Sequence, residues 1–173
     1  MNSQSSPKDL AALPSGTRVF IDANVFIYHF TQTPLTPAST AFLQRVEAGD
    51  VYGLTSVVIL AEVAHRLMIL EAIRTFGLAS RLAVKKLKEN TEFVRQLSHY
   101  KTATESIPSF NVTIEPVTFA HLRTAQDLST QHGLLTNDSL TAAMMQVLTL
   151  TDVVSNDPDL SGVPGLTVWR PQP

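Results

Sequence analysis

Short apolar runs alternate with longer helical patterns along this chain of 173 residues. The short runs are rich in β-branched residues and end at polar or turn-forming residues, which is typical of buried strands. Strands that are separated by helices favour a parallel sheet covered by those helices. The predicted strands lie near residues 18–21, 51–55, 111–115, 152–155 and 166–169. The pattern therefore predicts an α/β fold with a central parallel β-sheet flanked by helices.

Three helices are predicted from local signals. Thr36, followed by a proline, predicts a helix start with a cap and a first-turn proline, and Gly49 closes that helix. Thr118 predicts the cap of a second helix, which ends at Gly133. The segment 56–70 is apolar almost all the way round, which predicts a third helix that is largely buried.

Four acidic residues lie where the chain changes direction or within the apolar segment: Asp22, Glu62, Asp138 and Asp157. Three of them follow short apolar runs, and the ends of parallel strands meet at one sheet edge, where ligands bind in open α/β folds. Glu62 is predicted to lie on the buried helix, and a buried carboxylate is costly unless it is paired or binds a metal. The four acids therefore predict one metal site.

Each acid taken alone has a simpler interpretation. Asp22 and Asp138 could cap helices, because a carboxylate oxygen accepts the free N–H groups of a first helical turn. Glu62 could form an ion pair with Arg66 one turn further along the helix. Asp157 precedes a proline and could belong to a turn. The acids come from four separate parts of the chain, so only the fold can bring them together.

Short motifs surround the four acids. They are Ile21-Asp22-Ala23-Asn24, Thr55-Ser56 leading to Glu62, Asn137-Asp138-Ser139-Leu140-Thr141-Ala142-Ala143, and Ser155-Asn156-Asp157-Pro158-Asp159-Leu160 with Val163-Pro164-Gly165-Leu166 behind it. In their order, intervals and strand or helix context, these motifs resemble the PIN domain family, and within it the VapC-type toxin ribonucleases. The resemblance extends roughly from Arg18 to Trp169. Two departures are Leu160, where many relatives have an aromatic residue, and a longer segment at 74–110.

The resemblance implies a single PIN-like nuclease domain at residues 17–173, with three layers in the order α/β/α. The first nine residues are mostly polar, and residues 1–16 are expected to form a flexible N-terminal tail. The resemblance also implies an acidic quartet that binds Mg²⁺ or Mn²⁺ and carries catalysis, supported by two nearby polar residues. The quartet would be Asp22, Glu62, Asp138 and Asp157, and the supporting residues Asn24 and Ser56. It further implies an RNA substrate, a cognate antitoxin that blocks the acidic cleft, and a homodimer.

The composition of the chain excludes several kinds of metal site and of protein. The chain has no cysteine, which excludes disulfides and thiolate metal sites. Its five histidines lack the H-E-x-x-H spacing of zinc proteases, and His65 is interpreted as a helix-surface or indirect group near Glu62. No run of about 18 apolar residues is present, and the first residues lack the order of a signal peptide. A cytoplasmic protein with no membrane contact is expected.

Charge is unevenly distributed along the chain. Residues 74–101 contain seven basic and two acidic residues, whereas the chain from Thr102 onward contains two basic and seven acidic residues. A charge run alone usually forms a solvated helix face. Beside an acidic metal site, cations can instead hold the phosphate backbone of RNA. The candidates for RNA binding are Lys85, Lys86 and Lys88.

The predicted chemistry is metal-dependent hydrolysis of RNA phosphodiester bonds. Clustered carboxylates bind hard divalent cations, and mutual repulsion should raise some of their pKa values until a cation binds. A phosphatase of the haloacid-dehalogenase type is an alternative, but it requires a second aspartate where Asn24 stands. A catalytically silent PIN-like scaffold is the other alternative, although such modules tend to lose acids and this chain keeps four.

Overall fold

The computed structural model describes residues 6–173, and its centre is an all-parallel β-sheet of six strands in the order β1-β6-β5-β2-β3-β4. The strands are β1 (Lys8–Asp9), β2 (Arg18–Ile21), β3 (Tyr52–Ser56), β4 (Thr113–Glu115), β5 (Asp152–Val154) and β6 (Thr167–Arg170). The predicted parallel α/β sheet is confirmed. The five predicted strands are all present: β2 has the predicted ends, and the ends of the other four differ from the prediction by at most two residues.

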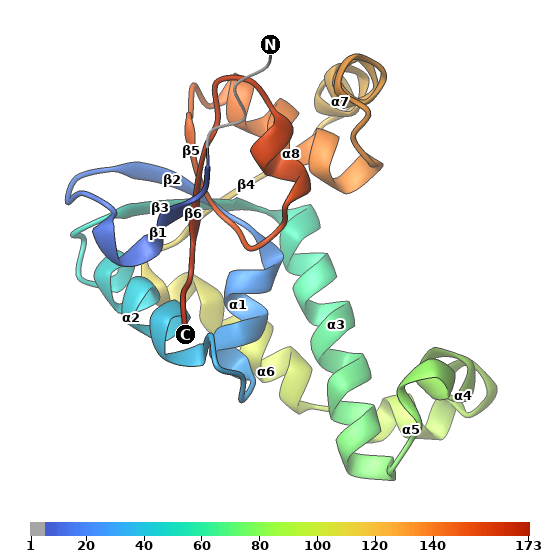
Figure 1. Ribbon diagram of the computed structural model, residues 1–173. Helices are drawn as coiled ribbons and strands as arrows, with labels where there is room; N and C mark the ends of the chain where they lie inside the picture. The colour runs from blue at the N-terminus through green and yellow to red at the C-terminus, as the bar shows by residue number, and fades with distance from the viewer. Residues whose placement is uncertain (1–5) are drawn as a thin grey trace.

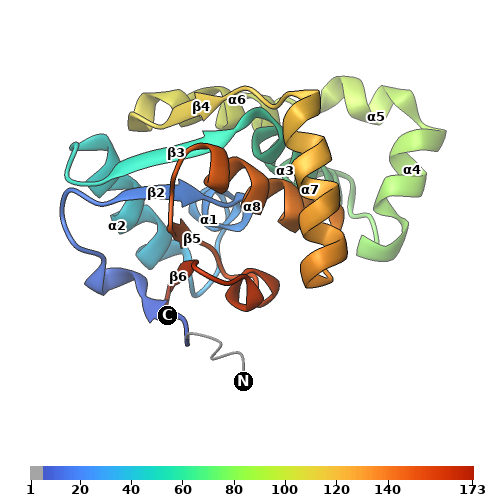
Figure 2. The ribbon, with the colours of Figure 1, turned by 90° about the horizontal axis from the view of Figure 1, so that it is seen from above.

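Helices cover both faces of the sheet (Figures 1 and 2). They are α1 (Ala23–Phe30), α2 (Thr36–Glu47), α3 (Val57–Phe76), α4 (Ala83–Glu89), α5 (Thr91–Gln96), α6 (His99–Ser106), α7 (Phe119–His132) and α8 (Thr136–Val147). α1, α2, α3 and α6 lie on one face and α7 and α8 on the other (Figure 1). Parallel strands need right-handed crossovers, so reversing the direction of travel across the sheet after β4 moves the connecting helices to the opposite face. This is the three-layer α/β/α arrangement that was predicted.

The main core lies around the central strand β2. Val19, Phe20 and Ile21 are fully buried, because both faces of β2 are covered. Phe26 of α1 packs into this core from one face and Met144 of α8 from the other. A strand buried on both faces has a continuous apolar sequence, which explains why the sequence pattern identified it.

Two helix starts were predicted from capping residues, with different outcomes. α7 follows the prediction: Thr118 is its N-cap, and Gly133, in the left-handed conformation at φ 71°, ends it. α2 begins at Thr36 with a first-turn proline, but its N-cap is Leu35, which makes no side-chain cap bond. The Thr36 hydroxyl instead donates to the carbonyl of Tyr28 at 2.8 Å, so it ties α2 to the end of α1.

The prediction that α3 is largely buried is wrong. Only one stripe of this helix is buried, whereas Val57 and Leu70 are 51% and 43% exposed. The far half of α3 extends beyond the sheet, where smaller helices cover it only in part (Figure 1). An apolar segment of sequence therefore does not show how far the neighbouring elements extend along the helix, and so it does not show which of its residues are buried. Despite its length and composition, α3 does not meet the requirements of a membrane span, and neither does any other helix within residues 6–173.

The far end of α3 carries a small helical lobe, formed by α4 and α5, that accounts for the extra length predicted at 74–110. The lobe has its own apolar cluster around Ala72, Leu87 and Leu97. Phe76 of α3 stacks on Phe93 of α5 with ring centroids 4.1 Å apart. The lobe is therefore a packed extension of the domain.

Glu71 fastens the start of α6, the helix that follows the lobe, to α3. Its carboxylate accepts the backbone N–H groups of Ser98 and His99 at 3.0 Å and of Tyr100 at 2.9 Å, at the start of α6. Partial burial raises the pKa of Glu71, but these three N–H bonds outweigh it, and the pKa is lowered overall. The ionised form is thus favoured at this helix N-terminus, as the helix dipole also requires.

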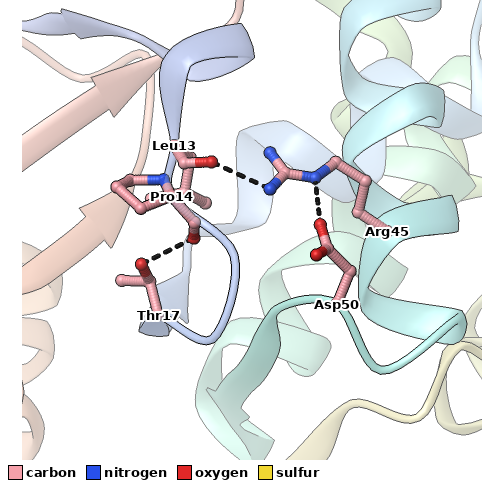
Figure 3. A network of polar contacts seen from close by, with 5 residues as sticks. All are labelled: Leu13, Pro14, Thr17, Arg45 and Asp50. Carbon is pink, nitrogen blue, oxygen red and sulfur yellow. Dashed lines mark hydrogen bonds and ion pairs between the residues drawn. The ribbon is translucent and has the colours of Figure 1, made fainter.

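The folded region begins before residue 17, where the sequence placed the end of a flexible tail. β1 pairs with β6, and Leu10 and Leu13 are each 3% exposed in the main core. Figure 3 shows how Arg45 of α2 holds this segment, donating to the Leu13 carbonyl at 2.8 Å and to the Asp50 carboxylate at 2.6 Å. A strand of two exposed residues leaves no periodic signal in the sequence. Residues 1–5 of the predicted tail lie outside the described residues.

Candidate active site

The candidate site lies where the order of the strands reverses. From β2 the chain continues to β3 and β4 on one side, and β5 then pairs with the other side of β2. In open α/β sheets, ligands bind in the crevice outside the carboxyl ends of the strands at such a point. Asp22 follows β2, and Ser155 follows the neighbouring strand β5, so these two residues lie side by side at the crevice and their side chains are hydrogen-bonded.

Asp22 is held by both strands and by the helix that follows it. One carboxylate oxygen accepts the backbone N–H of Ala23 at 2.7 Å, so Asp22 is the N-cap of α1. The other oxygen accepts the Ser155 hydroxyl and the Asn24 side-chain amide, each at 2.5 Å. The capping interpretation of Asp22 is therefore correct, and it leaves the carboxylate facing the crevice.

A chain of polar side chains holds this arrangement together. Asn24 donates to the Ser155 hydroxyl oxygen at 3.1 Å, and its carbonyl oxygen accepts the backbone N–H of Asn156 at 3.1 Å. The Asn156 amide in turn donates to the Tyr28 hydroxyl oxygen at 3.0 Å. The Ser155 oxygen also accepts the backbone N–H of Asp157 at 2.9 Å. Ser155 thus fixes Asp22 and Asp157 relative to each other.

Glu62 reaches the same crevice from the second turn of α3. Its carboxylate accepts the amide of Asn137, from the start of α8, at 3.3 Å. The alternative ion pair with Arg66 does not form within residues 6–173, where Arg66 has no salt bridge. Ser56, predicted as polar support for the site, is 2% exposed and caps α3 by accepting the N–H of Ile59 at 3.3 Å. Its support is indirect, because it orients the start of the helix that carries Glu62.

One cavity of about 530 Å³ brings all four predicted acids together. It is lined by Asp22, Ala23, Asn24, Ile27, Ile59, Glu62, Arg66, Leu135, Thr136, Asn137, Asp138, Thr141 and Asp157. The four acids are half-buried, at the boundary between the core and solvent. The predicted lysines lie apart from the cavity: α4, which carries them, is at the far end of α3 (Figure 1), and Lys85 and Lys86 both pair with Glu89.

The electrostatics of the cavity follow from four carboxylates that share it. Burial, followed by repulsion from Asp157, Asp159, Asp22 and Glu62, raises the pKa of Asp138 to about 6. The pKa of Asp22 is also raised, mainly by burial, although the bonds from Ser155 and Ala23 oppose the shift. The pKa is thus raised at Asp22 and Asp138, but burial contributes more to the rise than the mutual repulsion on which the prediction rested.

The donor set fits a hard divalent cation, because it consists of carboxylate oxygens around a cavity that is open to water. In the described part of the chain, no three His, Asp or Glu side chains are close enough together to form a metal-binding group. Neighbouring carboxylates repel one another, and a cation bound between them would relieve that repulsion. The four carboxylates that line one cavity are the observation that links the site to a cation.

Several polar residues of the site were not predicted from the sequence. Ser155, Asn156 and Asn137 lie within the motifs around the acids, so their positions carried a usable signal. Thr141 lies within the same motifs. Tyr28 carried no such signal, because a tyrosine on an amphipathic helix is more often part of the packing.

Comparison with known proteins agrees with this description. The PIN domain family model matches residues 19–166, so the chain belongs to the PIN domain family. Among solved structures, a toxin-antitoxin complex from Klebsiella pneumoniae is 15% identical with a TM-score of 0.56, and covers 89% of this chain and 98% of its own. VapC20 of Mycobacterium tuberculosis, described as a Sarcin-Ricin loop cleaving toxin, is 17% identical with a TM-score of 0.57, covering 83% and 92%.

VapBC2 from Rickettsia felis, solved with a DNA fragment from their promoter, is 14% identical with a TM-score of 0.56, covering 88% of this chain and 98% of its own. At these identities the similarity describes the fold alone. A comparison with curated proteins gives no match.

Proposed function

We propose that this protein is a metal-dependent endoribonuclease and the toxin of a type II toxin-antitoxin pair. The observation that carries the proposal is the convergence of Asp22, Glu62, Asp138 and Asp157 on one cavity at the switch point of the sheet. Membership of the PIN domain family and the names of the structural neighbours support it. Antitoxin binding and homodimerisation are part of the same proposal.

The four carboxylates would hold Mg²⁺ or Mn²⁺ between them. A divalent cation bound there would acidify a water molecule and neutralise charge on the phosphate, which is the chemistry that phosphodiester hydrolysis needs. Ser155 and Asn24 would keep the Asp22 carboxylate oriented toward the cavity, since both donate to its second oxygen. Asn137 would orient Glu62 in the same way.

The phosphatase alternative does not fit the geometry. It requires an acidic residue at the position of Asn24, but the Asn24 amide donates to Asp22 and Ser155, and a carboxylate there would repel Asp22. A catalytically silent scaffold would bind RNA without cleaving it, so the experiment that tests the nuclease hypothesis also tests this alternative.

Asp22→Asn is the most direct test. Asparagine caps helices about as well as aspartate, so the variant should fold, but it lacks the charge that binds metal. We expect cleavage of single-stranded RNA in the presence of Mn²⁺ to be lost, together with most of the rise in thermal midpoint that Mn²⁺ produces in the wild type. The matched control is Asp127→Asn, which removes an exposed carboxylate of α7 that does not line the cavity.

Three results are informative. Equal cleavage by the wild type and Asp22→Asn would refute the assignment of the site. A wild type that binds Mn²⁺ and RNA without cleaving would favour the silent scaffold. A collapsed thermal midpoint in Asp22→Asn alone would mean that the capping role dominates.

A further inference from the structure

Among the described residues that line the acidic cavity, Arg66 is the one with a cationic side chain. It lies on α3 four residues after Glu62, so the two residues share a face of the helix and are separated by about 6 Å along its axis. Four carboxylates around a cavity repel an RNA strand, whose backbone carries one negative charge at each phosphate. A cation placed in the wall of that cavity therefore calls for an explanation.

The charge of Arg66 is not neutralised by the protein. Within the described residues its guanidinium has neither an ion pair nor a hydrogen bond, and the side chain is exposed. The expected partner, Glu62, accepts a bond from Asn137 instead. The guanidinium thus keeps all five N–H donors for a ligand.

We propose that Arg66 binds a backbone phosphate of the RNA beside the scissile bond and so positions the strand in the cavity. The inference rests on the proposed ribonuclease function. A guanidinium suits this role because its planar fork donates two parallel N–H bonds to one phosphate, whereas an ammonium acts as a point charge. The cation held by the four acids would serve the scissile phosphate, so a separate protein cation is needed for its neighbour.

The basic residues of the lobe do not replace Arg66 in this role. α4 lies at the far end of α3 (Figure 1), and Lys85 and Lys86 are in part neutralised by Glu89 at 3.7 and 3.1 Å. Arg74, also exposed and without an ion pair in the described chain, lies eight residues beyond Arg66, or about 12 Å along the helix axis. Arg66 is therefore the residue that can act at the cavity itself.

The test compares Arg66→Ala with Arg74→Ala, which removes the same charge from the same helix outside the cavity. Both variants are made in the Asp22→Asn background, and binding of a labelled single-stranded RNA is measured by fluorescence anisotropy at several salt concentrations. We expect Arg66→Ala to weaken binding roughly tenfold to a hundredfold, as for the loss of hydrogen bonds to a charged group. The slope of log affinity against log salt should fall by about 0.7. Arg74→Ala should change binding less than about twofold, and Arg66→Lys should restore part of the loss.

The same substitutions in the otherwise wild-type protein separate positioning from general attraction. Arg66→Ala should lower kcat/KM, and it should keep or enlarge the Mn²⁺-induced rise in thermal midpoint, because a cation that repels the metal has been removed. Equal losses of RNA binding in Arg66→Ala and Arg74→Ala, or no loss in Arg66→Ala, would overturn the inference. A wild type that does not cleave RNA would refute the proposed function instead, while the binding comparison would still decide the role of Arg66.

Discussion

Replacing Asp138 by asparagine should stabilise the metal-free protein at neutral pH and leave its stability unchanged in acid. The pKa of Asp138 is raised to about 6, first by burial and then by its acidic neighbours, from an ordinary value of 3.8. The folded state therefore holds the proton more tightly than the unfolded state does. The stability that this proton provides is present below pH 3.8, and it is lost as the pH rises to about 6. Above that pH the ionised carboxylate remains a cost.

The size of the effect follows from the shift. About two pKa units correspond to roughly 3 kcal/mol as an upper limit. Asp138 is only half-buried, so screening by solvent reduces the expected cost to about 1–2 kcal/mol. In a chain of this size, each kcal/mol changes the thermal midpoint by about 2–4 °C, so Asp138→Asn should raise it by roughly 2–8 °C at pH 7.5. The gain should shrink as the pH falls toward 3.8 and disappear well below it, because the wild-type carboxyl is then protonated in both the folded and the unfolded state.

The assay is thermal unfolding of both proteins from pH 4 to pH 8 in the presence of a chelator, repeated at pH 7.5 with saturating Mn²⁺. Since a ligand that binds only the folded state stabilises it, Mn²⁺ should stabilise the wild type more than the variant and close the gap. Asp127→Asn is the control for the removal of a surface charge. A constant difference between Asp138→Asn and wild type at every pH would refute the reasoning, as would an equal gain in the control.

Two further predictions concern the lobe at the far end of α3. If Lys85, Lys86 and Lys88 contact the RNA backbone, replacing all three by alanine should weaken the binding of RNAs of unrelated sequence. The slope of log affinity against log salt should fall by up to about 2, and KM should change more than kcat. An unaltered slope would mean that the three lysines form a solvated helix face. Glu71→Gln should destabilise the start of α6 by about 1 kcal/mol, as for the loss of a helix cap. It should also speed amide hydrogen exchange in α5 and α6. Equal exchange in the variant and the wild type would show that apolar packing alone holds the lobe.

The parts of the fold that could be predicted are those whose cause lies in a short stretch of the sequence. The run Val19-Phe20-Ile21 is apolar because both faces of β2 are covered, and Gly133 ends α7 because the chain needs a positive φ there. The strand β1 and the exposed face of α3 have no signal of this kind in the sequence, and neither was predicted. A two-residue strand is too short to show a period, and the apolar residues Val57 and Leu70 of α3 lie outside its buried stripe, which depends on where the neighbouring elements pack.

The residues of the site could be predicted from the sequence, but the contacts between them could not. The acids could be identified because each one is out of place in an apolar segment or at a strand end. The bond from Ser155 to Asp22 joins residues 133 positions apart, and it exists because β5 pairs with β2 rather than with β4. No local pattern contains that choice. The distance between the α4 lysines and the cavity was equally hidden, since it depends on the length and direction of α3.

Asp22 shows why interpretations that compete in the sequence can both be true in the structure. At the end of a parallel strand, one residue both begins the next helix and faces the crevice above the sheet. Its carboxylate has about four lone-pair positions, and three of them are occupied, by Ala23, Asn24 and Ser155. The helix cap thus fixes the side chain in the orientation that presents it to the cavity. Capping is therefore part of how this fold builds an acidic site, and a cap at the end of a central strand is no argument against a metal ligand.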